Sequence, residues 1–333
     1  MEKQQNTAEA WHGGDKPFAA SYGKLMMWFF LITDALTFSA FLACYGFYRF
    51  SYPEIWPIAE DVFTHFPFLH GDHPLLFVAL MTFILIMSSV TMVLAVNYGH
   101  KMQKKKVILW LSLTIVGGIT FLGSQAWEWG HFIHGDSGGI NTETESVVHI
   151  AEGEELSSIY KLLNLDKYNF DSDQLIFSKY SYRNTCKVCK TDNVDLNINS
   201  IRKKCLDSIA IKTIINALQE KPEYNIRTAK KIYLSNSESI EYLEKHGKEI
   251  LIGSNLINNE YGHPLFADSF FFITGFHGFH VFSGVIILIV ILINVIKGTY
   301  ESRGHYEMIE KVGLYWHFVD LVWVFVFTFF YLV

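Results

Sequence analysis

The sequence predicts an all-α membrane protein, a five-transmembrane-helix bundle with a large extracytoplasmic insert between the third and fourth helices. Half of the 333 residues are hydrophobic and 16% are aromatic, which is too apolar for an ordinary soluble domain. Residues 133–267 change abruptly to a polar composition, with 16 Lys and Arg against 19 Asp and Glu. Five other stretches are long and apolar enough to cross a bilayer. These predicted spans are residues 24–50, 74–98, 107–132, 268–296 and 313–333.

Basic residues in the short flanks predict that the N-terminus is cytoplasmic and the C-terminus is outside, because such residues concentrate on the cytoplasmic side. In the short flanks, the predicted outer ends of the spans carry one basic residue, Arg49. The cytoplasmic set is Lys3, Lys16, Lys24, Lys101, Lys104, Lys105, Lys106, Lys297, Arg303 and Lys311. The predicted domains are a cytoplasmic segment 1–23, spans in 24–132, an outer insert 133–267 and spans in 268–333.

Two classes of feature are not expected. The polar N-terminus has no apolar core with a small-residue cleavage site, so we expect no removable signal peptide. No stripe of basic residues is interleaved with aromatics, so we expect no nucleic-acid partner.

The polar regions outside the membrane contain weaker signals. Residues 51–73 mix aromatics with prolines, which predicts a structural connection in the headgroup layer. Within the insert, residues 200–221 predict an amphipathic helix before Pro222, and residues 239–246 predict a shorter one. The rest of the insert is compatible with short strands or with disorder.

The fourth span contains two histidines inside an otherwise apolar run. His277 and His280 are three residues apart, so they lie on the same side of one helix and should face protein, not lipid. Gly275, Gly278 and Gly284 should allow neighbouring helices to approach closely.

Asp34 in the first span matches His280 in depth. At about 1.5 Å per residue, Asp34 lies roughly 15 Å from the cytoplasmic face, and His280 lies about 12 Å from that face of a 30 Å core. A carboxyl and an imidazole at one level can share a proton or form an ion pair, which offsets the cost of burying both. Two interpretations remain open: a polar pair that fixes helix register, and a lipid- or proton-linked role.

Two further polar groups occupy the third and fifth spans. Gln125, Glu128 and His131 share a face near the outer surface, where charged side chains at a helix end can reach water. His317 and Asp320 share a face about 6–10 Å above the cytoplasmic side, a depth that allows an aqueous approach. Packing and a proton- or headgroup-linked role remain open for the second group.

We expect no metal or haem in this chain. His277 and His280 lie on one turn and cannot flank a haem iron. A metal site made from these histidines and Asp34 lacks a third strong ligand.

The four cysteines predict no metal site either. Cys44 in the first span is expected to be a small core residue. Cys186, Cys189 and Cys205 lie in the insert and predict a local disulfide or free thiols in an oxidising compartment. Lys190, not His, follows the second cysteine, so the signature for covalent haem attachment is absent.

Several motifs together resemble subunit III of the haem-copper respiratory oxidases. They are LMMWFFLITDALTF in the first span, the Gln125 and Glu128 pair in the third, FFFITGFHGFHVFSG in the fourth and YWHFVDLVW in the fifth. The resemblance covers all five spans in the family's order and does not cover residues 133 to about 260. The family's buried carboxylate falls on Asp34, its paired histidines on His277 and His280, and its final motif on His317, Asp320 and Trp323.

The resemblance implies an accessory subunit of a proton-pumping cytochrome c oxidase in a bacterial inner membrane. Such a subunit binds no haem or copper itself and packs with subunits I and II and a small subunit IV, of which the catalytic partners carry haem and copper. It holds phospholipid in a cleft, supports proton uptake on the cytoplasmic side and protects the catalytic subunit during turnover.

The sequence departs from the family in three respects. Asp34 stands where the family usually has Glu, which makes contact with His280 harder to achieve. Two N-terminal helices of the longer family form are absent. The large insert is unusual and lies on the face where cytochrome c or another electron donor would dock. The equivalent subunit of a quinol oxidase or nitric oxide reductase remains an alternative, as does a proton-coupled transporter.

Overall fold

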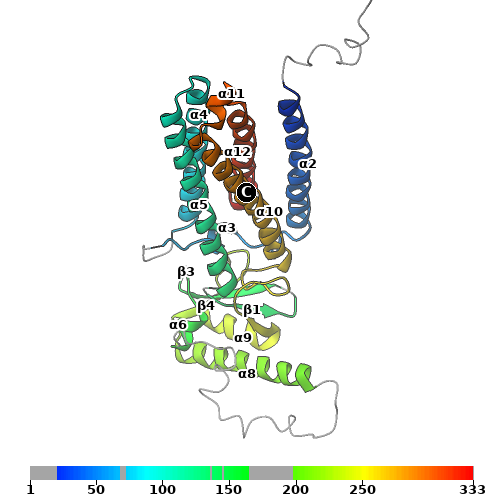
Figure 1. The fold of residues 1–333 in the computed structure, drawn as a ribbon. Coiled ribbons are helices and arrows are strands. Elements are labelled where there is room, and N and C mark those ends of the chain that lie inside the picture. The colour runs from blue at the N-terminus through cyan, green and yellow to red at the C-terminus, as the bar shows by residue number, and fades with distance from the viewer. Residues whose placement is uncertain (1–20, 68–72, 136, 145, 165–197, 333) are drawn as a thin grey trace, which may run out of the picture.

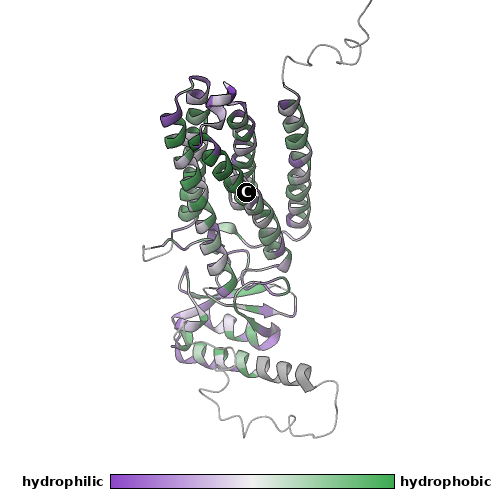
Figure 2. Ribbon diagram, in the orientation of Figure 1, coloured by the Kyte–Doolittle hydropathy of each residue, from purple (hydrophilic) through white to green (hydrophobic). Residues whose placement is uncertain are grey.

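The computed structural model describes residues 21–67, 73–135, 137–144, 146–164 and 198–332, with side chains from residue 208 onward in helix α8. In this part of the chain, five helices are long and apolar enough to cross a membrane, which confirms the predicted fold class (Figures 1 and 2). They are α2 (Tyr22–Ser51), α4 (Leu76–His100), α5 (Lys104–His134), α10 (Pro264–Ile296) and α12 (Glu307–Val326), which continues as the π-helical η4 (Phe327–Leu332). The short α11 (Thr299–Arg303) joins α10 to α12.

The centre of the bundle lies where α5, α10 and α12 meet around Trp316, which is fully buried. A Cβ atom on Gly118 would lie 2.6 Å from the Trp316 ring and 2.8 Å from Val285, so only glycine leaves room there. Gly284 approaches the same ring, with its Cβ position at 3.0 Å. Close approach through small residues is how helices pack in a membrane, where water does not drive them together.

The predicted role of the glycines in α10 is confirmed at two of three positions. A Cβ on Gly275 would lie 3.0 Å from Trp129, and Gly284 packs on Trp316. Gly278 has open space within 4 Å, so the expected close contact there is wrong. A helix turns by about 100° per residue, so Gly278 lies about 100° from His277 and about 160° from His280 around the helix axis. It therefore faces away from the neighbouring helices that bury these two histidines.

Helix α2 stands at the edge of the bundle beside α10 and α12 (Figure 1). Its buried side chains repeat at helical spacing and form one stripe: Leu31, Asp34, Phe38 and Tyr45. Most other positions on this helix are exposed, including Cys44. The prediction that Cys44 is a core residue is therefore wrong, because this cysteine lies on the face turned away from α10 and α12.

The insert between α5 and α10 contains a five-stranded antiparallel sheet, which the sequence left undecided. The strands are β1 (Gly139–Thr142), β2 (Val147–Glu152), β3 (Glu155–Leu156), β4 (Tyr224–Arg227) and β5 (Gly247–Leu251). Their order is β3-β2-β1-β5, with β4 also paired to β2. The register places Ile140 opposite Val148 and Ile150 opposite Ile226, so aliphatic residues from three strands line one face.

Three helices complete the insert and cover the sheet on the side away from the membrane bundle (Figure 1). They are α6 (Ile159–Leu163), α8 (Ile198–Glu220) and α9 (Asn236–His246). Helix α8 contributes Ile211, Ile214 and Leu218 to a core shared with the strands and with Leu243 of α9. Both amphipathic helices predicted in the insert are thus confirmed. Ser235 begins α9 with a capping box, in which its hydroxyl accepts from the Glu238 amide.

Polar contacts hold the insert against the outer ends of the helices. The connection between α2 and α4 contains α3 (Ala59–Val62), and Asp61 in this helix pairs with Arg227 of β4 at 2.5 Å. Nε2 of His149 in β2 donates to the backbone carbonyl of Glu260 at 3.0 Å. The Glu260 carboxylate accepts from the Gly253 amide at 2.6 Å. Loop, sheet and helix ends are therefore one connected unit.

Candidate functional site: polar residues inside the membrane bundle

Asp34 and His280 meet inside the bundle. Nε2 of His280 lies 3.3 Å from Oδ1 of Asp34, and each side chain is only 10% exposed. Nδ1 of His280 donates to the Phe276 carbonyl at 2.8 Å, since a carbonyl can only accept. Nε2 can then accept from a protonated Asp34 or, as part of an imidazolium, donate to the carboxylate. In both states the pair is neutral overall and holds one exchangeable proton.

The surroundings of this pair are apolar. The Phe38 and Phe276 rings lie 5.4 Å and 4.7 Å from the His280 ring, and the second oxygen of Asp34 has no hydrogen-bond partner. The sequence placed both residues at one depth, and the structure shows that the shorter aspartate still reaches the imidazole. The contact between Asp34 of α2 and His280 of α10 attaches the edge helix to the bundle near the middle of both helices.

His277 has a different environment from His280 although the two share one side of α10. It is completely buried, and its Nε2 donates to the Val319 carbonyl of α12 at 3.1 Å. Its Nδ1 has no hydrogen-bond partner, and its ring lies 5.1 Å from Trp323. Trp323 in turn donates from Nε1 to the Thr82 hydroxyl of α4 at 3.0 Å. His277 and Trp323 therefore connect α10, α12 and α4, and neither contacts Asp34.

The side chains of His317 and Asp320 extend from α12 toward α4. The Nδ1 atom of His317 is 2.7 Å from the Ser89 hydroxyl. Asp320 is 6% exposed, and neither of its carboxyl oxygens has a hydrogen bond of ordinary geometry. Both oxygens are closed off from the surface, which favours the packing interpretation over an aqueous approach. Ser89 was missed by the sequence reasoning, since a single hydroxyl in an apolar run gives no distinctive signal.

Gln125 and Glu128 are buried, contrary to the expectation that this helix end reaches water. The Gln125 amide donates to Glu128 at 2.8 Å, and the Tyr331 hydroxyl of η4 donates to the same carboxyl oxygen at 3.1 Å. Glu128 is 4% exposed because η4 and the loop after α3 close over it. Tyr331 could not be predicted as a partner, because 203 residues separate it from Glu128.

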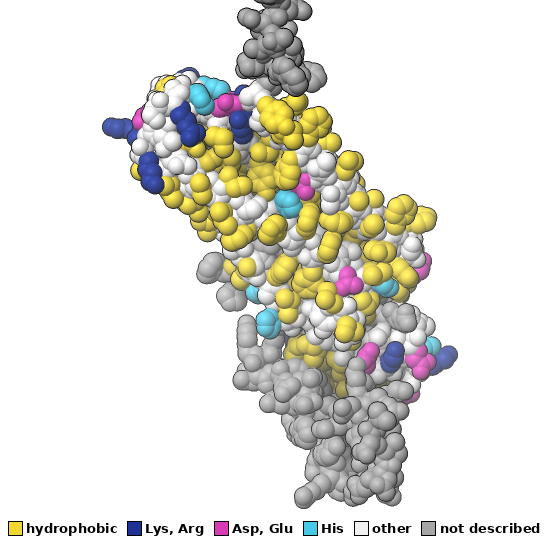
Figure 3. Space-filling view, turned by 45° about the vertical axis from the view of Figure 1, so that its right-hand side comes forward, with side chains coloured by type: hydrophobic (Ala, Val, Ile, Leu, Met, Phe, Trp, Pro, Cys, Tyr) yellow, Lys and Arg dark blue, Asp and Glu magenta, His cyan; other side chains and the backbone are white. Residues whose placement is uncertain are grey.

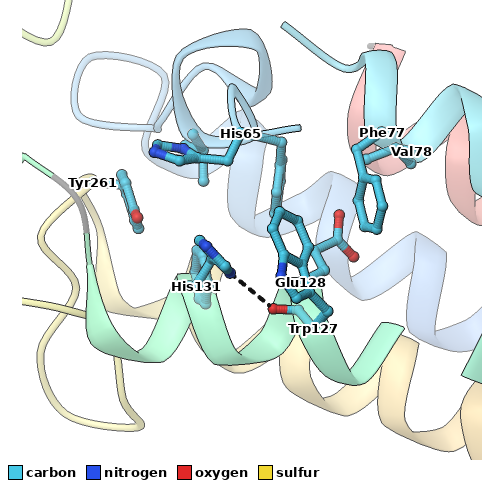
Figure 4. Close-up of a pocket in the computed structure, with 10 residues that line it drawn as sticks. His65, Phe77, Val78, Trp127, Glu128, His131 and Tyr261 are labelled. Carbon is cyan, nitrogen blue, oxygen red and sulfur yellow. Dashed lines mark hydrogen bonds between the residues drawn. The ribbon is translucent and has the colours of Figure 1, made fainter. Parts of the chain in front are cut away.

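His131 does not join the hydrogen bonds of Glu128, although both line one small cavity of about 20 Å³ (Figure 4). Its Nδ1 donates to the Trp127 carbonyl at 3.2 Å, drawn as a dashed line in the figure. The His131 ring lies 3.9 Å from the Trp127 ring and 5.6 Å from the His65 ring. The three residues predicted to share a face are thus divided between a buried acid–amide pair and a histidine nearer the surface.

An apolar groove separates α2 from α12. Its volume is about 370 Å³, and its walls include Phe38 and Leu42 of α2 and Phe318, Val322 and Phe325 of α12. A second groove of about 690 Å³ lies at the end of α2 nearer the insert, where Arg49 and Glu60 stand among aromatic side chains. The first groove is lined mainly by apolar side chains, whereas the second combines aromatic side chains with a positive and a negative charge.

The cysteines of the insert fall outside what the structure describes. Cys186 and Cys189 are not among the described residues, and the Cys205 side chain is not described either. Their predicted pairing therefore remains a prediction. Within the described ranges, no three His, Cys, Asp or Glu side chains lie close enough together to hold a metal ion.

Comparison with known proteins finds a family match that covers α10 and α12. The model of the family "Cytochrome c oxidase subunit III" matches residues 256–333. This part of the chain is thus similar to that family. The match includes His277, His280, His317, Asp320 and Trp323, whereas Asp34 and Glu128 lie outside it.

Similar proteins carry the same family name. A "Probable cytochrome c oxidase subunit 3" of Rickettsia felis is 44% identical over 69 residues, which are 20% of this chain and 25% of that protein. "Cytochrome c oxidase subunit 3" of Rhipicephalus sanguineus is 48% identical over 67 residues, or 20% and 26%. The mouse protein is 42% identical over 64 residues, or 19% and 24%. The chain thus matches about a quarter of the length of these relatives.

Proposed function

We propose that this chain is the accessory, non-redox subunit III of a proton-pumping cytochrome c oxidase. The observation that carries the proposal is the family match over α10 and α12, which contains both histidine motifs. In this proposal the haem and copper that reduce oxygen to water belong to partner subunits. The chain would pack with subunits I and II and a small subunit IV.

The Asp34 and His280 pair supplies the proton-linked part of the proposed role. It can hold one proton in an apolar environment, and it lies across the contact between the edge helix and the bundle. In a pair of this kind the proton can move between the two groups without a change in net charge, and this keeps the free-energy cost of burying them low. We infer that it supports cytoplasmic-side proton uptake by keeping α2 in place beside its neighbours.

Phospholipid is the proposed ligand of the two grooves beside α2. The apolar groove fits an acyl chain, and Arg49 at the second groove offers a positive charge for a lipid phosphate. The two grooves lie on the same helix, so one lipid type with a tail and a headgroup would satisfy both.

The proposed location is a bacterial inner membrane with a cytoplasmic N-terminus. Lysines and arginines gather at the end of the bundle opposite the insert, as Figure 3 shows from one side. This distribution supports the positive-inside orientation. The insert would then face the periplasm, where cytochrome c or another electron donor arrives.

Removal of the chain tests the proposal. In cells that lack it, membranes should keep the haem absorbance of the oxidase, whereas activity during sustained turnover should decay faster than in the parent. Loss of the haem spectrum together with all activity would contradict an accessory role. An unchanged rate of decay would contradict a protective role.

Substitution of the buried pair tests the proton-linked part separately. We expect Asp34→Asn and His280→Ala to leave initial electron transfer largely intact and to speed the loss of oxygen consumption during turnover. Thr37→Ala, on the exposed face of α2 and outside the lining of both grooves, is the matched control and should behave like the parent. Equal decay in all variants would remove the pair from the proposed role.

A further inference from the structure

Two consecutive aliphatic side chains are presented outward by a short hairpin of the insert. Leu256 is 70% exposed and Ile257 is 79% exposed. In the described part of the insert, the other strongly exposed large hydrophobic residue is Ile232, at 54%. Comparable exposure occurs on the membrane-spanning α2, where Phe47 is 71% exposed and Phe50 is 84% exposed. The hairpin tip thus has the exposure of a lipid-facing surface.

The base of this hairpin is rigid, so the exposed tip is a fixed feature. Ser254 is 2% exposed and Asn259 is fully buried, and the Ser254 hydroxyl donates to the Asn259 side chain at 2.7 Å. The Asn255 side chain accepts from the Ile257 and Asn258 amides at 2.8 Å and 2.9 Å. Turn tips in soluble domains are normally polar, and this one places two aliphatic residues between asparagines.

The hairpin is attached at the level where α5 leaves the membrane. The Ser254 amide donates to the Ile133 carbonyl in the last turn of α5 at 3.3 Å. Trp127 and Trp129 lie four to six residues earlier, or about 6–9 Å along the helix, and tryptophans at a span end are expected at the membrane–water interface. Three residues cannot carry the tip more than about 10 Å from Ser254. The tip is therefore within reach of the headgroup layer.

The base of the hairpin is bonded to both the sheet and the membrane bundle. On one side Glu260 receives a hydrogen bond from His149 of the sheet, and on the other Ser254 is bonded to α5. Figure 1 shows the sheet directly beneath the ends of α5 and α10. The base of the hairpin therefore lies between the sheet and the end of α5.

We propose that Leu256 and Ile257 insert into the boundary between the headgroups and acyl chains of the outer leaflet, so that the insert is anchored to lipid as well as to the helices. This anchor fixes the sheet at one height above the bilayer. The proposal requires only that the five helices span a membrane, and it is independent of the proposed oxidase role.

Photo-crosslinking from the tip tests the proposal. Ile257→p-benzoylphenylalanine, made in the full chain and irradiated in native membranes, should form a phospholipid adduct that mass spectrometry detects. Leu256→p-benzoylphenylalanine should give the same result and guards against a local effect of one substitution. Glu241→p-benzoylphenylalanine is the matched control, because Glu241 is exposed on α9 on the far side of the sheet, and it should yield no lipid adduct. Cross-linking of the tip to a polypeptide alone, or to nothing, would overturn the proposal.

Discussion

Removal of the Asp61 carboxylate should destabilise the insert more than removal of its partner Arg227, because the two side chains differ in burial. The Arg227 side chain is 5% exposed and the Asp61 side chain is 27% exposed, with 2.5 Å between them. In Asp61→Ala the guanidinium is left buried without a counter-ion, a change that costs about 3–5 kcal/mol. In Arg227→Met the carboxylate remains partly hydrated and keeps Lys231 at 3.6 Å. The cost should then be about 1–2 kcal/mol.

Hydrogen exchange of the backbone amides in β4 and β2 measures this difference in the full chain. At 1.4 kcal/mol per tenfold change, exchange in Asp61→Ala should accelerate by about 10²- to 4 × 10³-fold. The double variant with Arg227→Met should exchange more slowly than Asp61→Ala alone, because the uncompensated charge is gone. Lys230→Met is the control: its ion pair with Glu54 is exposed on both sides and should contribute nothing measurable. Equal effects of the two single substitutions would refute the reasoning.

Two further predictions concern pH and packing. Burial lowers the pKa of His149 to about 4, whereas the unfolded residue titrates near 6.5. The unfolded chain therefore binds more protons as pH falls from about 6.5 to 4, and the insert should melt at a lower temperature at pH 5 than at pH 7. His149→Gln should flatten that dependence, and an unchanged pH profile would contradict the assignment. Gly118→Ala should destabilise the bundle by about 1–3 kcal/mol in denaturant titrations in micelles, because the new methyl group would collide with Trp316. Gly123→Ala has open space and should be neutral; similar losses in both would contradict the packing argument.

The spans and the contact between Asp34 and His280 were predictable because both depend on simple periodic geometry. Length and hydropathy define a membrane helix, and equal depth brings two polar residues on neighbouring helices to one level. The partners of Glu128 and His317 were not predictable, because Tyr331 and Ser89 are ordinary residues whose positions depend on how the helices pack. The exposure of Cys44 was missed for a related reason. In a membrane helix both faces are apolar, so composition does not distinguish the packed face from the exposed one.

The sheet of the insert could not be predicted from the sequence either. Its strands are two to six residues long and pair across large separations, as between β1 and β5. Short strands give weak alternation. The helices α8 and α9 were found because their apolar positions repeat over two or more turns.

Affinity purification of the tagged chain from its native membranes in mild detergent tests the central claim most directly. The account predicts that haem-containing subunits co-purify and that the complex consumes oxygen with reduced cytochrome c. It further predicts that the chain shows no haem absorbance once it is separated from those subunits. Recovery of the chain without any haem protein, or with haem bound to the isolated chain, would contradict the account.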